Sequence, residues 1–184
     1  MSIKKEILKK NEGGEIEKDE FTNLIMDDMQ IGEISAEDKE FLEGFKETCF
    51  LSLNSTGLKS IENMPAMPKL QRLELCDNKL SGSVAPLVAL YPNLQVLKLS
   101  NNQFKTIETA EITSLKNLEH LQSLDLSKNP LVEALGTEYQ QTLRKLLITL
   151  DEFEVLDSLN KDGEEVVSDD DDEGDEDDSD AASD

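Results

Sequence analysis

Few residues of this chain could perform catalysis. His120 is the only histidine, and it lies beside Leu121 inside a repeated pattern, where we expect a structural surface position. With a single histidine, the sequence encodes no recognisable Ser-His-Asp or Cys-His arrangement. It also lacks a phosphate-binding glycine-rich loop and the Cys and His spacing of a zinc site. We therefore predict a protein that is not an enzyme and that has no catalytic residues, cofactor or metal site.

A run of acidic residues could bind a cation. Asp169–Gly174 resembles the first half of a calcium-binding loop, with Gly174 at its sixth position. The eighth position is Glu176 instead of an apolar residue, the twelfth is Asp180 instead of glutamate, and no amphipathic helices flank the run. We therefore expect at most weak and non-specific binding of divalent cations.

The same run belongs to a segment of concentrated negative charge. Residues 162–184 contain 14 acidic residues and no lysine or arginine, so the rest of the chain carries only −9 of the net charge of −23. Such a composition predicts disorder, and we define residues 158–184 as the acidic tail. The tail residues expected to contact a basic partner are Asp169, Asp170, Asp171, Asp172, Glu173, Asp175, Glu176, Asp177 and Asp178. Ser168, directly before this run, is a possible phosphorylation site. The alternative is a tail that only improves solubility.

The charge and the cysteine count limit the partners and the compartment. A net charge of −23 argues against direct binding of nucleic acid or of an anionic membrane and favours basic proteins. Two cysteines are too few for a disulfide framework, which indicates a reducing compartment. We find no apolar stretch that would serve as a signal peptide or reach the roughly 20 residues of a membrane span. We expect an intracellular monomer.

A repeated pattern, L-x-x-L-x-L-x-x-N-x-L, organises the chain. The five copies are Phe21, Leu24, Met26, Met29, Ile31; Thr48, Leu51, Leu53, Thr56, Leu58; Leu70, Leu73, Leu75, Asn78, Leu80; Leu94, Leu97, Leu99, Asn102, Phe104; and Leu121, Leu124, Leu126, Asn129, Leu131. Their spacing lies within the 20–29 residues of leucine-rich repeats. We therefore predict an α/β fold, a right-handed leucine-rich-repeat solenoid with a parallel sheet on its concave face and helices or 3₁₀ turns on its convex face.

The residue types in the repeat have physical roles. The central L-x-L is a short strand whose leucines point into the core, because strand side chains alternate. The asparagine amide can bond to backbone groups that the inward turn leaves in the interior. Thr56 is a partial substitute for this amide. Met29 offers no such group, so we expect an irregular first coil.

The remaining segments should form return elements and caps. We expect a helix that begins at Ser35, and helical or 3₁₀ turns around Ile61–Met67, Val84–Leu90 and Ile107–Leu118. We predict an N-terminal cap helix in residues 1–20 and about five repeats with a C-terminal cap in residues 21–157, the cap beginning at Tyr139. Residues that alternate with the buried leucines should face the concave surface. The candidates for partner binding on that face are Asn23, Asp27, Phe50, Asn54, Arg72, Glu74, Lys98 and Asp125.

The repeats and the acidic tail together resemble the acidic leucine-rich nuclear phosphoprotein 32 family. The resemblance rests on Leu51–Ile61, Leu70–Gly82, Pro92–Asn102, the capping stretch from Leu146-Leu147 to Leu156-Asp157, and the tail. It implies binding of core histones, a role as histone chaperone or chromatin regulator, and a nuclear location with cytoplasmic shuttling. Some members of the family inhibit a serine/threonine protein phosphatase, which is the alternative. A third hypothesis is a ribonucleoprotein adaptor like the spliceosomal snRNP A′ protein, against which the acidic tail argues.

Overall fold

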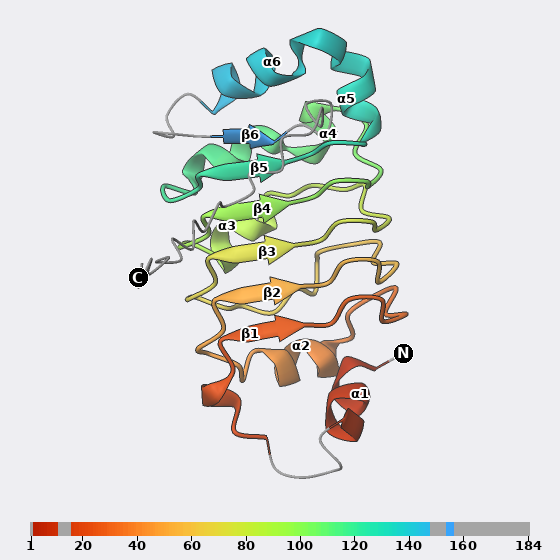
Figure 1. Cartoon of the computed structure of the whole chain (residues 1–184), viewed down its shortest axis with the longest axis vertical. Coiled ribbons are helices and arrows are strands. Elements are labelled where there is room, and N and C mark those ends of the chain that lie inside the picture. The colour runs from red at the N-terminus through yellow and green to blue at the C-terminus, as the bar shows by residue number, and fades with distance from the viewer. Residues whose placement is uncertain (1, 11–15, 148–153, 157–184) are drawn as a thin grey trace, which may run out of the picture.

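The computed structural model describes residues 2–10, 16–147 and 154–156, and they form a stack of short parallel strands along one axis (Figure 1). Within these residues, one sheet runs in sequence order through β1 (Asn23–Ile25), β2 (Phe50–Ser52), β3 (Arg72–Glu74), β4 (Val96–Lys98), β5 (Ser123–Asp125) and β6 (Glu154–Leu156). The acidic tail, with Ser168 and all its candidate contact residues, lies outside the described part. The predicted solenoid is confirmed.

The strand leucines set the register of the sheet. Leu24 pairs with Leu51, Leu51 with Leu73, Leu73 with Leu97, Leu97 with Leu124, and Leu124 with Val155. From the second copy to the fifth, these leucines have no exposed surface. Full burial of such a side chain contributes about 1.5–3 kcal/mol, so the stacked leucines are a main source of stability.

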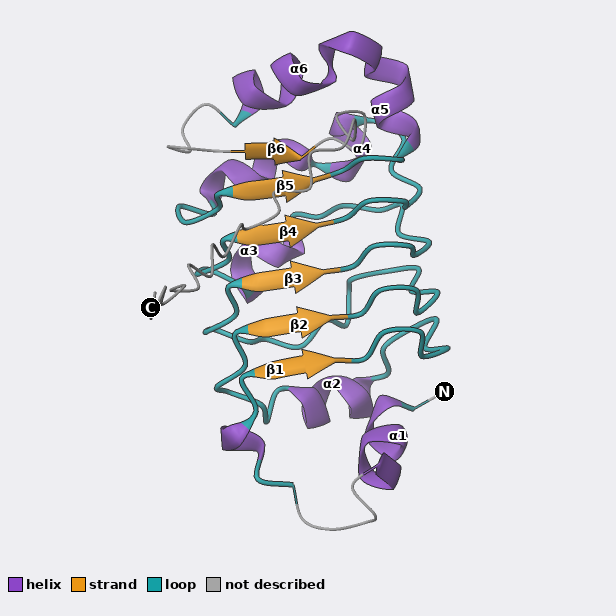
Figure 2. Cartoon of the chain, in the orientation of Figure 1, coloured by secondary structure: helices purple, strands orange, loops and turns teal. Residues whose placement is uncertain are grey.

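Helices and turns return the chain between strands. They are α1 (Ile3–Lys10), η1 (Lys18–Glu20), α2 (Ala36–Leu42), α3 (Pro86–Leu90), α4 (Ile107–Ala110), η2 (Ile112–Asn117), α5 (Pro130–Leu135), η3 (Gly136–Glu138) and α6 (Tyr139–Leu146). In Figure 2, α3 and α4 lie behind the sheet. The predicted helical turn around Ile61–Met67 is wrong, because this segment forms only a non-helical turn. Pro65 and the following Pro68 lack the N–H groups that a helix needs.

Three interior asparagines join successive coils, as the repeat predicts. Asn102 donates from Nδ2 to the backbone carbonyls of Leu75 and Leu99, at 2.9 and 3.0 Å, and accepts at Oδ1 from the Leu80 N–H at 3.0 Å. Asn78 and Asn129 make the equivalent bonds one coil before and one coil after. Each amide thus satisfies interior backbone groups of two neighbouring coils.

The first coil shares one backbone feature with the later coils but closes with different hydrogen bonds. Asp28 has a φ of 61°, close to the 52–58° of the equivalent residues Ser55, Asp77, Asn101 and Lys128. Thr56 has no amide to receive the N–H of Ile31, and its backbone carbonyl accepts that bond at 3.0 Å instead. The Thr56 hydroxyl donates to the Leu53 carbonyl within its own coil. The Ile31 N–H is shared with the Met29 carbonyl at 2.8 Å, so the first coil is bonded differently from the later coils, as its sequence predicts.

Both ends of the described solenoid carry helices. Asp38 of α2 is 1% exposed and connects α2 to the first turn of α1. Its Oδ1 accepts from the Ser2 hydroxyl at 2.8 Å and from the Lys4 N–H at 2.9 Å, and its Oδ2 accepts from the Ser35 hydroxyl at 2.8 Å. At the other end, α6 lies next to β6 (Figure 1). No helix in the described part of the chain is long and apolar enough to cross a membrane.

Candidate functional site

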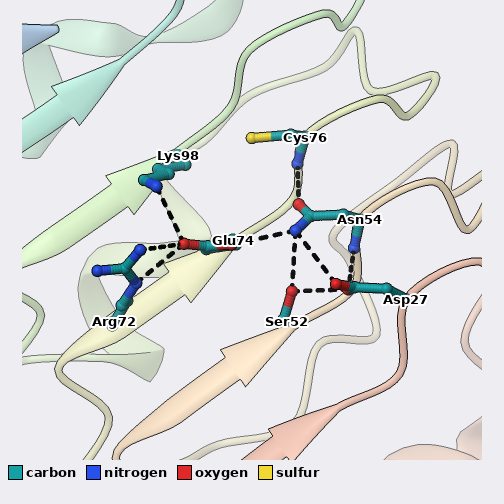
Figure 3. A network of polar contacts seen from close by, with 7 residues as sticks. All are labelled: Asp27, Ser52, Asn54, Arg72, Glu74, Cys76 and Lys98. Atoms are coloured by element: carbon teal, nitrogen blue, oxygen red, sulfur yellow. Dashed lines mark hydrogen bonds and ion pairs between the residues drawn. The ribbon is translucent and has the colours of Figure 1, made fainter. Parts of the chain in front are cut away.

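The candidate site is a polar network on the open face of the sheet, which we define as the face formed by residues that flank the buried strand leucines. Figure 3 shows its members on β2, β3 and β4 and in the turns that follow β1, β2 and β3. They are Asp27, Ser52, Asn54, Arg72, Glu74, Cys76 and Lys98. Five of these were predicted to bind a partner, and the structure brings those five together.

Asp27 anchors the network at the N-terminal end. Its Oδ1 accepts from the Ser52 hydroxyl at 2.6 Å and from the Asn54 N–H at 2.7 Å. The Asn54 side-chain amide donates to the Ser52 hydroxyl oxygen at 2.9 Å, and its Oδ1 accepts from the Cys76 N–H at 2.7 Å. Asn54 therefore links the first three coils on this face through hydrogen bonds.

Glu74 is the charged centre of the network. Its Oε1 accepts from Nε and a second guanidinium nitrogen of Arg72 and lies 3.2 Å from Lys98 Nζ, while Oε2 accepts from the Asn54 amide at 3.1 Å (Figure 3). Burial alone would raise the pKa of the Glu74 carboxyl, but the hydrogen bonds from Arg72, Asn54 and Lys98 outweigh it and hold the pKa below its ordinary value. The carboxylate is therefore ionised at neutral pH and neutralises part of the neighbouring positive charge.

Apolar surface adjoins the charged centre. The Arg72 guanidinium lies over the Phe50 ring, 5.3 Å from its centroid, and Phe50 pairs with Arg72 in the register of the sheet. Such a cation–π contact orients the arginine while it leaves part of the ring accessible. Burial raises the pKa of the Cys76 thiol, so this cysteine is a neutral thiol at physiological pH. The face thus combines paired charges with one half-buried aromatic ring.

Other predicted site residues lie apart from the network. Asn23 is exposed at β1, at the outer edge of the sheet. Asp125 of β5 accepts from the Ser127 N–H at 2.9 Å. His120 and Cys49 line one pocket, but the Cys49 thiol donates to the Glu47 carbonyl, and no described hydrogen bond joins it to His120. The described residues contain no group of three or more potential metal ligands.

Sequence reasoning identified the face but not its pairings. Ser52 and Cys76 are not among the candidate residues, and the sequence did not predict the Glu74–Lys98 ion pair. The signal was present in the repeat, because equivalent positions of consecutive coils become neighbours in a parallel stack. Glu74 and Lys98 occupy equivalent positions and are register partners. Comparison of the residues at equivalent positions of consecutive repeats would therefore have predicted this pair.

Comparisons with known proteins agree with this geometry. Residues 68–131 match the family model for leucine-rich repeats. The solved SNF/U2A′ complex of Drosophila melanogaster contains a similar chain, with a TM-score of 0.51 and 22% identity over 59% of this chain and 62% of that chain, which shows a shared fold. The chain is a leucine-rich-repeat protein, a class whose open sheet face is a common surface for protein–protein interaction.

A curated relative identifies the family more closely. The acidic leucine-rich nuclear phosphoprotein 32-related protein of Plasmodium falciparum (isolate 3D7) is 36% identical over 149 residues, which is 80% of this chain and 50% of the relative. This chain therefore spans about half the length of that relative. This match confirms the resemblance to the acidic leucine-rich nuclear phosphoprotein 32 family that the sequence indicated.

Proposed function

We propose that the chain is a non-enzymatic, histone-binding chaperone or chromatin regulator, in which the open face selects the partner and the acidic tail supplies affinity. The observation that carries this proposal is the distribution of charge. Residues 162–184 hold 14 acidic residues without a single base, whereas the charges at the centre of the open face are paired with each other. A dense run of carboxylates attracts proteins rich in lysine and arginine, and core histones are the basic partners that the family resemblance implies.

The two surfaces contribute differently to binding. Attraction between the tail and a basic protein acts over about 10 Å at 0.1 M salt and does not depend on residue order. Contacts of Phe50, Asn54 and Arg72 depend on shape and on hydrogen-bond geometry, and these side chains are held in place by their neighbours. The proposal therefore assigns encounter and affinity to the tail and specificity to the open face.

The proposal also covers the location of the protein in the cell and the phosphorylation of its tail. The name of the Plasmodium falciparum relative contains the words nuclear and phosphoprotein. We propose a nuclear location, with shuttling to the cytoplasm, and phosphorylation of Ser168. A phosphate at Ser168 would add about −1.5 to −2 charge beside Asp169 and strengthen the attraction for histones.

Affinity capture from a nuclear extract tests the proposal. Full-length protein should retain core histones, and a variant truncated after Asn160 is the matched control that should retain far less. Recovery of phosphatase subunits by both proteins would instead support an inhibitor of a serine/threonine phosphatase. Recovery of splicing proteins would support a ribonucleoprotein adaptor. Either result without histones would contradict the proposed function.

A further inference from the structure

Among the described strands, β1 forms one edge of the sheet. Within the described sheet, β1 pairs with β2 alone. The Met26 N–H donates to the Ser52 carbonyl, and the Thr22 carbonyl accepts from β2 on the same side. Because backbone groups of successive strand residues alternate in direction, the N–H and C=O groups of Asn23 and Ile25 face away from β2. Such groups are available for an additional strand.

Apolar side chains surround this edge. Ile25 is 62% exposed and Phe21 is 41% exposed, and they are the exposed large apolar residues in the described part of the chain. Together with Ile7 of α1 and Ile16, they line a pocket of about 240 Å³. The Phe21 ring packs edge-on against the Phe45 ring, with 5.7 Å between the ring centroids, and this contact fixes one wall of the pocket. The pocket can therefore receive one bulky apolar side chain beside the strand edge.

The surroundings of the pocket are acidic. Glu6 lines it, and Glu17, Asp19, Glu20 and Asp28 are exposed in the segments that flank β1. Lys18 keeps its positive charge, but its Nζ contacts α2 instead of these carboxylates: it donates to the Phe41 carbonyl at 2.8 Å and lies 4.0 Å from the Phe41 ring centroid. Lys5 and Lys9 of α1 are also exposed and, like these four acidic residues, do not line the pocket, so Glu6 is the charged residue of its described lining. This charge favours a segment with lysine or arginine beside its apolar residue.

We propose that β1 binds an extended segment of a basic partner protein as an added strand. The segment would pair its backbone with Asn23 and Ile25, insert one bulky apolar side chain beside Phe21, and place flanking lysines or arginines against the acidic surroundings. Strand addition supplies affinity through main-chain bonds and specificity through the pocket. This surface shares no residue with the acidic tail or with the polar network, so the proposal goes beyond the proposed function.

A designed peptide tests strand addition directly. The probe is a ten-residue peptide of alternating lysine and valine with one central leucine, and its binding to the full chain is measured by fluorescence anisotropy. One control peptide carries N-methyl groups on alternate backbone amides, which blocks pairing without a change of charge. We expect the control to bind about tenfold more weakly, because it loses several main-chain hydrogen bonds. The acidic tail, which attracts charge alone, would bind both peptides equally.

Two variants of the exposed Ile25 separate the contribution of its backbone N–H to peptide binding from that of its side chain. Ile25→Pro removes the outward N–H as well as the side chain, and proline is tolerated there because that N–H is not used by β2. Ile25→Ala removes the side chain and keeps the N–H. We expect about tenfold weaker peptide binding for Ile25→Pro and about threefold for Ile25→Ala, with unchanged thermal unfolding midpoints.

Several results would overturn the inference. Equal affinity of the methylated and unmethylated peptides would show that the tail binds the probe. Unchanged affinity in both Ile25 variants, or no binding at all, would exclude strand addition at β1. Dimers in sedimentation experiments that disappear in Ile25→Pro, together with no peptide binding, would assign the edge to a second copy of the chain.

Discussion

Asn102 shows how one side chain supports two coils. Asn102→Ala leaves the Leu80 N–H without its acceptor in the interior. The carbonyls of Leu75 and Leu99 each lose one of two amide donors and keep the other, from Asn78 and Asn129 respectively. An unsatisfied buried polar group costs about 1–3 kcal/mol, so we expect the free energy of unfolding to fall by about that amount. Urea denaturation measures this change.

The neighbouring Gln103 provides the control. It is exposed, and its contact with the preceding coil uses the backbone N–H, which Gln103→Ala retains. This variant should change stability by less than about 0.5 kcal/mol. Equal stability of both variants would show that the asparagine amide does not support the turns.

The buried core leucines give a second prediction at the same scale. Leu99 has no exposed surface, and Leu99→Ala removes apolar contacts and leaves a cavity. We expect a loss of about 2–5 kcal/mol in the free energy of unfolding. A loss below about 1 kcal/mol would contradict the repeat register on which the whole fold rests.

Tyr91 presents the opposite case, in which a residue weakens the core. Its side chain is completely buried, and its hydroxyl has no hydrogen-bond partner among the described residues. Burial raises the pKa of this hydroxyl well above its ordinary value. Tyr91→Phe removes the unpaired group and keeps the ring, so we expect a gain of about 1 kcal/mol in urea denaturation. A loss of stability would reveal that the hydroxyl has a partner.

At the scale of elements, the attachment of α1 to α2 depends on the ionised Asp38. Burial would raise the pKa of its carboxyl, but the hydrogen bonds from Lys4, Ser2 and Ser35 hold it below the ordinary value of about 3.9. A lowered pKa in the folded state contributes stability that is present above pH ~4 and is lost as the pH falls through the folded pKa. We expect the amide protons of α1 to lose exchange protection as the pH is lowered below about 4, and in Asp38→Ala already at pH 7.

Glu37 serves as the matched control for this attachment. It forms an ion pair with Lys4 at 2.8 Å, but its side chain is 65% exposed. Exposed pairs contribute about 0–1 kcal/mol, so Glu37→Gln should leave the exchange of α1 nearly unchanged at pH 7. If both variants reduce the exchange protection of α1 equally, the helix is held by charge attraction and not by its buried hydrogen bonds to Asp38.

The repeat elements were predictable from sequence because every coil uses the same residues at the same spacing. Leucine spacing predicted the strand register, and Asn78, Asn102 and Asn129 predicted the turns. Contacts outside the repeat were not predictable. The bond from Asp38 to Lys4 joins residues that share no periodic position, and only the folded structure brings them together. The bond from the Ile31 N–H to the Thr56 carbonyl was also not predictable, because side-chain types do not determine which backbone groups bond to each other.

At the scale of the whole molecule, the repeat domain should fold without the acidic tail. The described core is stabilised by stacked leucines and asparagines, none of which lies beyond residue 156. Truncation after Asn160 should leave the thermal unfolding midpoint unchanged or raise it slightly, because it removes much of the like charge. Loss of cooperative unfolding in that variant would show that the tail is part of the fold.

The division of labour between tail and open face is tested most directly by titration of core histones at several salt concentrations. Full-length protein, the variant truncated after Asn160, and a variant with residues 162–184 shuffled are compared. Screening shortens from about 10 Å at 0.1 M salt to about 3 Å at 1 M, so affinity of the full-length protein should fall steeply with salt. We expect truncation to weaken binding and flatten the salt dependence, and shuffling to change neither. If truncation leaves affinity and salt dependence intact, the tail does not bind histones and the proposed function is wrong.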